Sequence, residues 1–194
     1  MFQGRADGAL IAYRADDGAL LWRFATGLGI SSPPVTYAVD DRQYVALLVG
    51  WGGAQAMLGG SIAAQYGWSY GRHPRRLLSF ALDGEAVLPR PTPPAFAKPL
   101  EVADFVIDET LAEKGLSRYV RSCAWCHGPG ATAGGGAPDL RASLIVTSRD
   151  AFKKVLVDGQ LVARGMPRFA EFSNEDREEL MHFLRKKAHE SIVK

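Results

Sequence analysis

The chain has two cysteines, and a histidine directly follows the second. Cys123 and Cys126 are three positions apart, close to one helical turn, and His127 comes next. Two thiols at this spacing can add to the two vinyl groups on one edge of a haem, and the imidazole that follows can then bind the iron. The pattern is typical of covalent attachment of a c-type haem. The sequence therefore predicts that this segment carries a haem.

Other roles for the cysteine pair remain open. A redox-active pair is expected at the start of a helix beside a strand, whereas a helical pattern surrounds Cys123 and Cys126. A structural zinc site needs four ligands, and the sequence contains no second cluster of cysteine or histidine. A chance match is the third alternative. Haem attachment fits best, because a predicted helix leads directly into Cys123.

Six-coordinate haem iron needs a second axial ligand opposite His127. We favour Met166, which lies in a Gly-Met-Pro sequence between two predicted helices, where a loop can turn the thioether inward. Loop packing is the alternative role for Met166. A histidine–methionine pair raises the reduction potential relative to two histidines, and a haem with both axial positions filled transfers electrons and does not bind oxygen. The other candidates considered are Met57, Met181, His73, His182 and His189.

These other candidates have simpler explanations. Met181 and His182 fall within the last predicted helix, where Met181 is expected in the core or on the surface. His189 is close to the end of the chain and is expected to be solvated. His73 belongs to a basic loop that is expected to face solvent.

Three further residues are expected to support the haem. The carbonyl of Pro138 could accept a hydrogen bond from His127 and thereby fix the ring and raise its donor strength. Arg141 could pair with a haem propionate, or it could be an exposed loop arginine. Trp125 could lie against the porphyrin rim, or its ring could be exposed.

A small all-α domain must position these side chains. We predict helices over residues 108–122 and 149–158 and a last helix capped by Ser173, separated by an irregular glycine-rich segment at 127–147. Gly159 suits the C-cap of the second helix. The residues expected on the buried faces of the three helices are Leu111, Leu116, Tyr119 and Val120; Phe152, Val155 and Leu156; and Leu180, Phe183 and Leu184.

The N-terminal part has the pattern of strands and tight turns. Strands are predicted over residues 9–14, 20–26, 34–39, 43–50 and 76–82, with hairpin turns at 15–18 and 40–42 and a long insertion at 51–75. A sheet of five such strands would leave hydrogen-bonding edges open. We therefore expect residues 1–88 to be part of a larger β structure. A proline-rich linker at 89–104 would separate them from the helical domain at 105–194.

Composition excludes several other classes of protein. The 194 residues are 47% hydrophobic and 23% charged, as in ordinary globular proteins, and the formal net charge of +2 is too small to indicate nucleic-acid binding. No apolar run approaches the ~20 residues of a transmembrane helix. No signal peptide is visible at the start, so the sequence shows no export signal.

Residues 105–190 resemble the monohaem class I cytochrome c fold. The resemblance is carried by the Cys-Ala-Trp-Cys-His-Gly sequence at 123–128, the Ala-Pro-Asp-Leu-Arg sequence at 137–141 and the Gly-Met-Pro sequence at 165–167. It implies that His127 and Met166 are the axial ligands and that the Pro138 carbonyl supports the histidine.

Residues 7–88 resemble the closing blades of the propeller of quinoprotein alcohol dehydrogenases. Residues 12–22, which end in Gly-Ala-Leu-Leu-Trp, are similar to the tryptophan-docking motif of that family, although Arg14 and Asp17 depart from it. The whole chain is thus similar to the C-terminal part of quinohaemoprotein alcohol dehydrogenases. That family uses pyrroloquinoline quinone and calcium to oxidise alcohols in the periplasm, and it passes the electrons to the haem. The catalytic aspartate, the calcium ligands and most quinone contacts belong to earlier blades that this chain lacks.

The expected fold is a two-part α+β chain, with a partial antiparallel β-propeller followed by an all-α cytochrome c domain. The expected function is electron transfer through covalent haem c, from reduced quinone in the rest of the propeller, or in a partner dehydrogenase, to an external small redox protein or quinone. The alternatives are an independent cytochrome c carrier with a β docking segment, and a haem domain retained only for stability. The resemblance implies that the chain is part of a quinone-dependent alcohol dehydrogenase but lacks the catalytic blades, so by itself it is not expected to oxidise alcohol.

Overall fold

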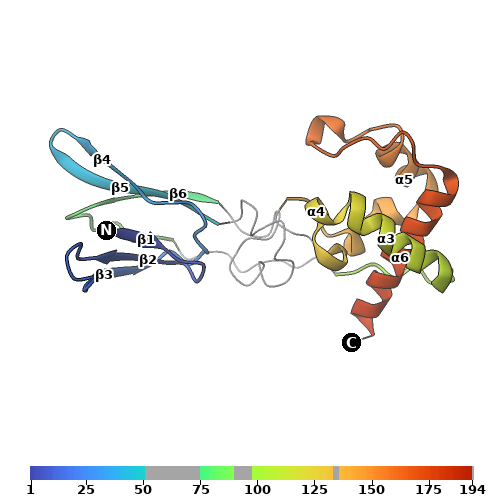
Figure 1. Cartoon of the computed structure of the whole chain (residues 1–194), viewed down its shortest axis with the longest axis horizontal. Coiled ribbons are helices and arrows are strands. Elements are labelled where there is room, and N and C mark those ends of the chain that lie inside the picture. Colours follow the sequence, from blue (N-terminus) through green and yellow to red (C-terminus); the bar gives the residue numbers. More distant parts are fainter. Residues whose placement is uncertain (51–74, 90–97, 133–135, 194) are drawn as a thin grey trace. The chain divides into compact units, whose positions relative to one another are not determined.

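The structure is a computed structural model that describes residues 1–50, 75–89, 98–132 and 136–193 (Figure 1). These residues divide into two compact units, one formed mainly by residues 1–95 and the other mainly by residues 96–194. Most of the predicted insertion at 51–75 and part of the predicted linker at 89–104 lie outside the described residues, as do Met57 and His73.

The β unit begins with a three-stranded antiparallel sheet. Its strands are β1 (Phe2–Gly4), β2 (Ala9–Tyr13) and β3 (Leu20–Ala25), and they lie in the order β1-β2-β3 (Figure 1). The predicted strands at 9–14 and 20–26 correspond to β2 and β3. Strand β1 was missed, because three residues are too few to show an alternating pattern.

A second three-stranded antiparallel sheet follows. It contains β4 (Val35–Val39), β5 (Arg42–Val49) and β6 (Arg76–Ala81), again in chain order. Asp40 and Asp41 have φ angles of 47° and 57°, so they form a tight two-residue turn of the kind that joins hairpin strands. The turn is one residue shorter than predicted, because Arg42 already pairs with Val39.

The two sheets share a small core and leave many apolar side chains uncovered. Leu10, Leu28, Ile30, Leu47, Val49 and Leu78 form the buried cluster. Among the large apolar side chains exposed by 39% or more are Leu20, Leu21, Trp22, Val35, Tyr37, Val39, Leu48 and Leu77. Within the described residues each sheet has three strands, whereas a propeller blade has four. Uncovered apolar surface of this kind is expected where further β structure packs against the two sheets. It agrees with the prediction that residues 1–88 are part of a larger β structure.

The helical unit contains α3 (Glu109–Ser122), α4 (Ala124–His127), α5 (Arg149–Leu156) and α6 (Asn174–Ile192). Ser173 caps α6 and forms a reciprocal capping box with Asp176. Helix α5 ends at Leu156, earlier than predicted, and Val157 rather than Gly159 is its C-cap. The segment predicted as irregular contains short 3-10 turns at Pro129–Ala131, Leu140–Ala142 and Leu144–Thr147, and a fourth lies at Val162–Arg164. None of the described helices is long and apolar enough to span a bilayer.

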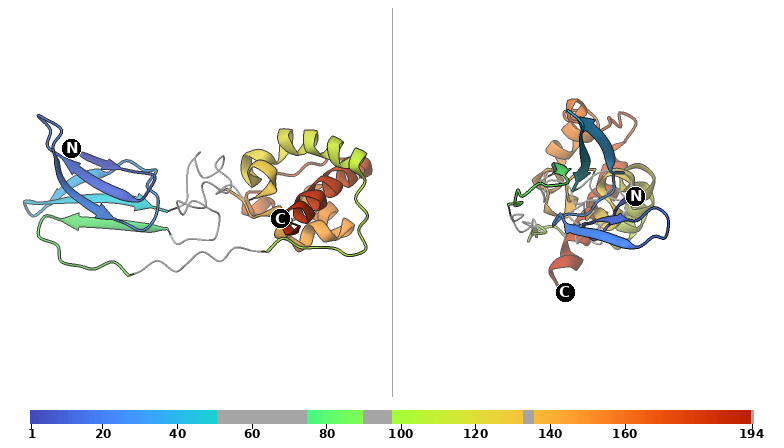
Figure 2. Two further views of the ribbon diagram at one scale, coloured as in Figure 1. Left: turned by 90° about the horizontal axis from the view of Figure 1, so that it is seen from below. Right: turned by 90° about the vertical axis from the view of Figure 1, so that its left-hand side faces the viewer.

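Helices α3 and α6 cross in close contact (Figure 2). The buried residues of α3 are Ala112, Gly115 and Tyr119. The apolar face predicted for α3 was therefore wrong in part, since Leu116 and Val120 are 47% and 60% exposed. The reason is steric: a Cβ atom on Gly115 would lie 2.0 Å from the backbone oxygen of Glu179, so this crossing selects small residues rather than large apolar ones.

We expect Gly115→Ala to destabilise the helical unit. Helix propensity alone would stabilise it by up to about 1 kcal/mol. The new methyl group would instead force the two backbones apart, and overpacking of this kind costs about 1–3 kcal/mol. Urea unfolding of the haem-bearing protein measures the change. Ser117→Ala, at an exposed position of the same helix, is the control and should change the free energy of unfolding by less than about 0.5 kcal/mol. A more stable Gly115→Ala variant would contradict the close crossing.

Candidate haem site

Cys123 directly follows helix α3, and Cys126 and His127 lie about one turn later, at the end of helix α4. Cys123 caps the end of α3, and its carbonyl accepts the backbone N–H of His127 at 2.9 Å. Both cysteines are free thiols: Cys123 is buried in the main apolar cluster, and Cys126 is half-buried. Burial raises the pKa of the Cys123 thiol to about 12. Both sulfur atoms therefore remain available for bonds to a haem.

His127 is buried, with an exposed fraction of 4%. Its Nδ1 atom lies 2.9 Å from the Pro138 carbonyl oxygen, and since a carbonyl only accepts, Nδ1 carries the proton. The other nitrogen, Nε2, therefore has a free lone pair, and it is buried without a hydrogen-bond partner among the described residues. Burial also lowers the pKa of His127, which favours the neutral ring. A neutral imidazole whose second nitrogen is held by a carbonyl is the usual form of a histidine metal ligand.

Directly after Pro138, the buried Asp139 forms an ion pair with the half-buried Arg141. The Asp139 carboxylate accepts hydrogen bonds from Nε and Nη2 of Arg141 at 3.0 and 2.7 Å, and Nη1 of Arg141 donates to Ser191 Oγ at 2.9 Å. The pair ties the chain beside His127 to helix α6. A contact of Arg141 with a haem propionate stays a prediction.

Met166 lies in the loop between α5 and α6. The turn at Val162–Arg164 ends at Gly165, whose φ of 88° is readily adopted by glycine, and the backbone N–H of Met166 donates to Leu161 O at 3.2 Å. The Met166 side chain is half-buried and packs against the same apolar cluster that contains Cys123. The structure thus brings this methionine and the attachment segment to one core, and its role as a ligand stays a prediction.

The other described candidates have different surroundings. Met181 is 2% exposed within the core. His182 is also buried, and its Nδ1 accepts the backbone N–H of Asp108 at 3.0 Å. The side chain of His189 is 52% exposed and lies 3.5 Å from a carboxylate oxygen of Glu101. Trp125 is 59% exposed.

Tyr119 is a positioning residue that sequence reasoning treated only as part of an apolar face. Its hydroxyl donates a 2.6 Å hydrogen bond to the carbonyl of Gly128, directly after His127. The side chain is 1% exposed, and burial is the main reason that its pKa is raised. Its position one helical turn before Cys123 was the available signal, because a buried tyrosine usually needs a partner for its hydroxyl.

These residues fit a covalently attached haem. The fit rests on the partnerless Nε2 atom of His127, which lies in the same segment as two free cysteines. Among the residues that the structure describes, no three His, Cys, Asp or Glu side chains come together as a metal site. These residues therefore do not assemble a four-ligand zinc site of such side chains.

Comparison with known proteins identifies the class of the helical unit. Residues 110–184 match the family described as cytochrome c oxidase, cbb3-type, subunit III. Together with the attachment motif and the fold, this match shows that the helical unit is similar to cytochrome c domains, as the sequence predicted.

The whole chain is similar to a part of quinone-dependent alcohol dehydrogenases. It is 38% identical over 192 residues to the dehydrogenase subunit of alcohol dehydrogenase (quinone) from Gluconobacter oxydans, covering 98% of this chain and 25% of that protein. It is 37% identical to quinohemoprotein alcohol dehydrogenase ADH IIB from Pseudomonas putida, covering 100% of this chain and 28% of that protein. The chain spans about a quarter of the length of these relatives.

Solved structures agree with this similarity. The structure of quinohemoprotein alcohol dehydrogenase ADHIIG from Pseudomonas putida HK5 matches with a TM-score of 0.81 and 36% identity, covering 100% of this chain and 27% of that one. The structure of quinohemoprotein alcohol dehydrogenase from Comamonas testosteroni matches with a TM-score of 0.69 and 32% identity, covering 97% of this chain and 26% of that one. The predicted resemblance and the predicted fold class, antiparallel β structure followed by a helical cytochrome c domain, are confirmed.

Proposed function

We propose that this chain relays single electrons from the quinone site of an alcohol dehydrogenase propeller to an external acceptor. The observation that carries the proposal is the buried, partnerless Nε2 of His127 beside two free cysteines. When bound, the haem supplies an iron that alternates between the ferrous and ferric states. Cys123 and Cys126 would hold it through thioether bonds.

The protein residues keep this iron suited to electron transfer. His127, with its ring fixed by the Pro138 carbonyl, and Met166 would bind the iron. Tyr119 holds the backbone at Gly128 and so keeps the attachment segment in place. With both axial positions filled, the site would not bind oxygen.

The β unit supports a propeller as the source of the electrons. Its uncovered apolar side chains, and the three strands of each sheet within the described residues, support the packing of more β structure against it. The relatives are about four times as long as this chain and carry names that specify quinone-dependent alcohol oxidation. We propose that the remaining blades, which would hold pyrroloquinoline quinone and calcium, belong to the same protein or to a partner chain. Haem c attachment and the resemblance together favour the periplasm as the location.

Rapid-mixing spectroscopy tests the proposal. The matured chain alone should not be reduced by alcohol. The same haem should be reduced within the complete dehydrogenase after loading with pyrroloquinoline quinone and calcium. A haem that stays oxidised in the complete, active enzyme would contradict the relay. Alcohol oxidation by the isolated chain with the quinone and calcium would contradict the assignment of catalysis to the missing blades. A soluble monomer with a folded β unit and no affinity for a propeller would favour an independent carrier.

A further inference from the structure

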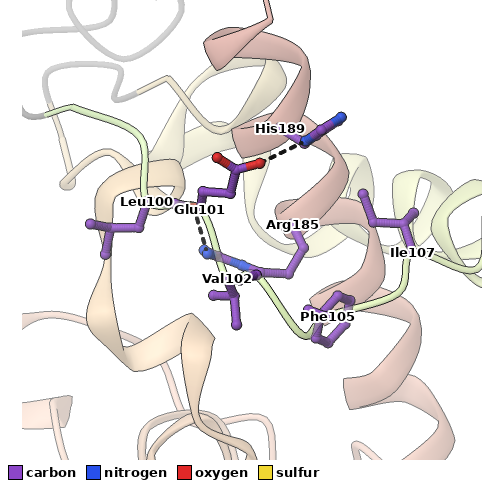
Figure 3. A pocket seen from close by; sticks show the side chains of 8 residues that line it. Leu100, Glu101, Val102, Phe105, Ile107, Arg185 and His189 are labelled. Atoms are coloured by element: carbon purple, nitrogen blue, oxygen red, sulfur yellow. Dashed lines mark hydrogen bonds and ion pairs between the residues drawn. The ribbon is translucent and has the colours of Figure 1, made fainter.

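We propose that Arg185 forms a carboxylate-binding site in a cavity of the helical unit. The cavity has a volume of about 170 Å³ and lies between α6 and residues 100–107 (Figure 3). Its lining includes Leu100, Glu101, Val102, Phe105, Arg185 and His189. A cavity of this size has room for more than one water molecule.

Arg185 is buried, with an exposed fraction of 4%. Its Nη1 atom donates to the backbone oxygen of Leu100 at 3.1 Å. The atoms Nε and Nη2, which form one edge of the guanidinium, are buried and have no hydrogen-bond partner among the described residues. Buried charged groups are almost always paired, so this empty edge calls for a ligand.

Other arginines of the same unit show which group binds to such an edge. Arg118, Arg141 and Arg149 each direct Nε and Nη2 to the carboxylate of Glu179, Asp139 or Glu178 at distances between 2.7 and 3.1 Å. The planar guanidinium edge matches the two oxygen atoms of a carboxylate. The empty edge of Arg185 is therefore suited to the same group.

The described side chains of this chain do not supply that carboxylate. Glu101 lines the cavity, but it is directed to His189, with Oε1 3.5 Å from Nδ1 (Figure 3). Burial lowers the pKa of Arg185, as expected for a buried guanidinium. The segments outside the described residues contain no aspartate or glutamate. We therefore assign the carboxylate to a group outside the described side chains, either a haem propionate or a small free acid. Only the first source rests on the proposed function.

Thermal unfolding of the haem-bearing full chain in sodium acetate tests the proposal, with sodium chloride at equal ionic strength as the reference. If the site takes a free acid, acetate raises the unfolding midpoint of the wild type as its concentration increases. Arg185→Met should abolish the rise. Arg185→Lys, which keeps the charge but loses the planar edge, should weaken acetate binding about tenfold or more. Lys154→Met, which removes an exposed charge from α5, should respond to acetate as the wild type does.

If a haem propionate fills the site, acetate has no effect, and the NMR resonances of the propionate groups shift in Arg185→Lys and Arg185→Met but not in Lys154→Met. The proposal is overturned if acetate has no effect and these resonances stay unchanged. It is also overturned if Glu101→Gln lowers the unfolding midpoint as much as Arg185→Met does, because Glu101 would then be the partner of Arg185. Neither arm requires electron transfer, so a failure here is distinct from a failure of the proposed relay.

Discussion

Replacing Met166 by histidine is expected to lower the reduction potential of the haem by an amount on the order of a few hundred millivolts. The thioether of methionine stabilises ferrous iron, whereas a second imidazole stabilises ferric iron, and axial ligands as a group span about 0.8 V. The substitution leaves Cys123 and Cys126 unchanged, so the haem should stay attached through its thioether bonds. Spectroelectrochemical titration of the matured variant measures the change.

Met181→Leu is the matched control for this substitution. Met181 is a buried methionine of α6 that packs in the same apolar cluster, so its replacement changes the core without changing the iron ligands. Its potential should stay within a few tens of millivolts of the wild type, a shift roughly an order of magnitude smaller than an axial-ligand exchange. An unchanged potential in Met166→His, with the sulfur-to-iron charge-transfer band still present, would exclude Met166 as a ligand.

Replacing His127 by glycine is expected to abolish the low-spin spectrum of the haem. The variant keeps both cysteines but loses the buried Nε2 atom, and the Pro138 carbonyl loses its donor. Free imidazole has the shape and the donor nitrogen of the missing ring. Added imidazole should therefore restore the low-spin absorption spectrum in a saturable way.

His189→Gly provides the comparison. Its side chain is half exposed and lies beside Glu101, so its removal should leave the spectrum unchanged, with or without imidazole. A low-spin spectrum in His127→Gly before imidazole is added would show that another side chain binds the iron. The assignment of His127 would then be wrong.

Local sequence features were sufficient to predict how Cys123, Cys126 and His127 are arranged along the chain. The attachment segment spans about one helical turn. The spacing of Cys123, Cys126 and His127 therefore determines their relative positions without contacts to distant parts of the chain. The strands of the two hairpins were also predictable, because turn-forming residues at 15–18 and 40–42 separate segments that are rich in apolar residues. Gly165 and the proline after Met166 similarly marked a loop between two helices.

Features that depend on contacts distant in sequence were not predictable. The close crossing at Gly115 depends on the backbone of Glu179 in another helix. The apolar pattern of α3 alone therefore predicted that Leu116 and Val120 are buried. The hydrogen bond of Tyr119 and the empty edge of Arg185 likewise arise only when the segments fold together. A pattern along one helix reports which residues are apolar and cannot report how closely the next helix approaches.

The proposed relay requires an iron porphyrin that is bonded covalently to this chain through Cys123 and Cys126. Extraction of the matured protein with acidified organic solvent, followed by haem staining of a denaturing gel, tests it most directly. We expect the colour to stay with the polypeptide through both steps. Pigment that passes into the solvent, or a protein that matures without colour, would contradict it.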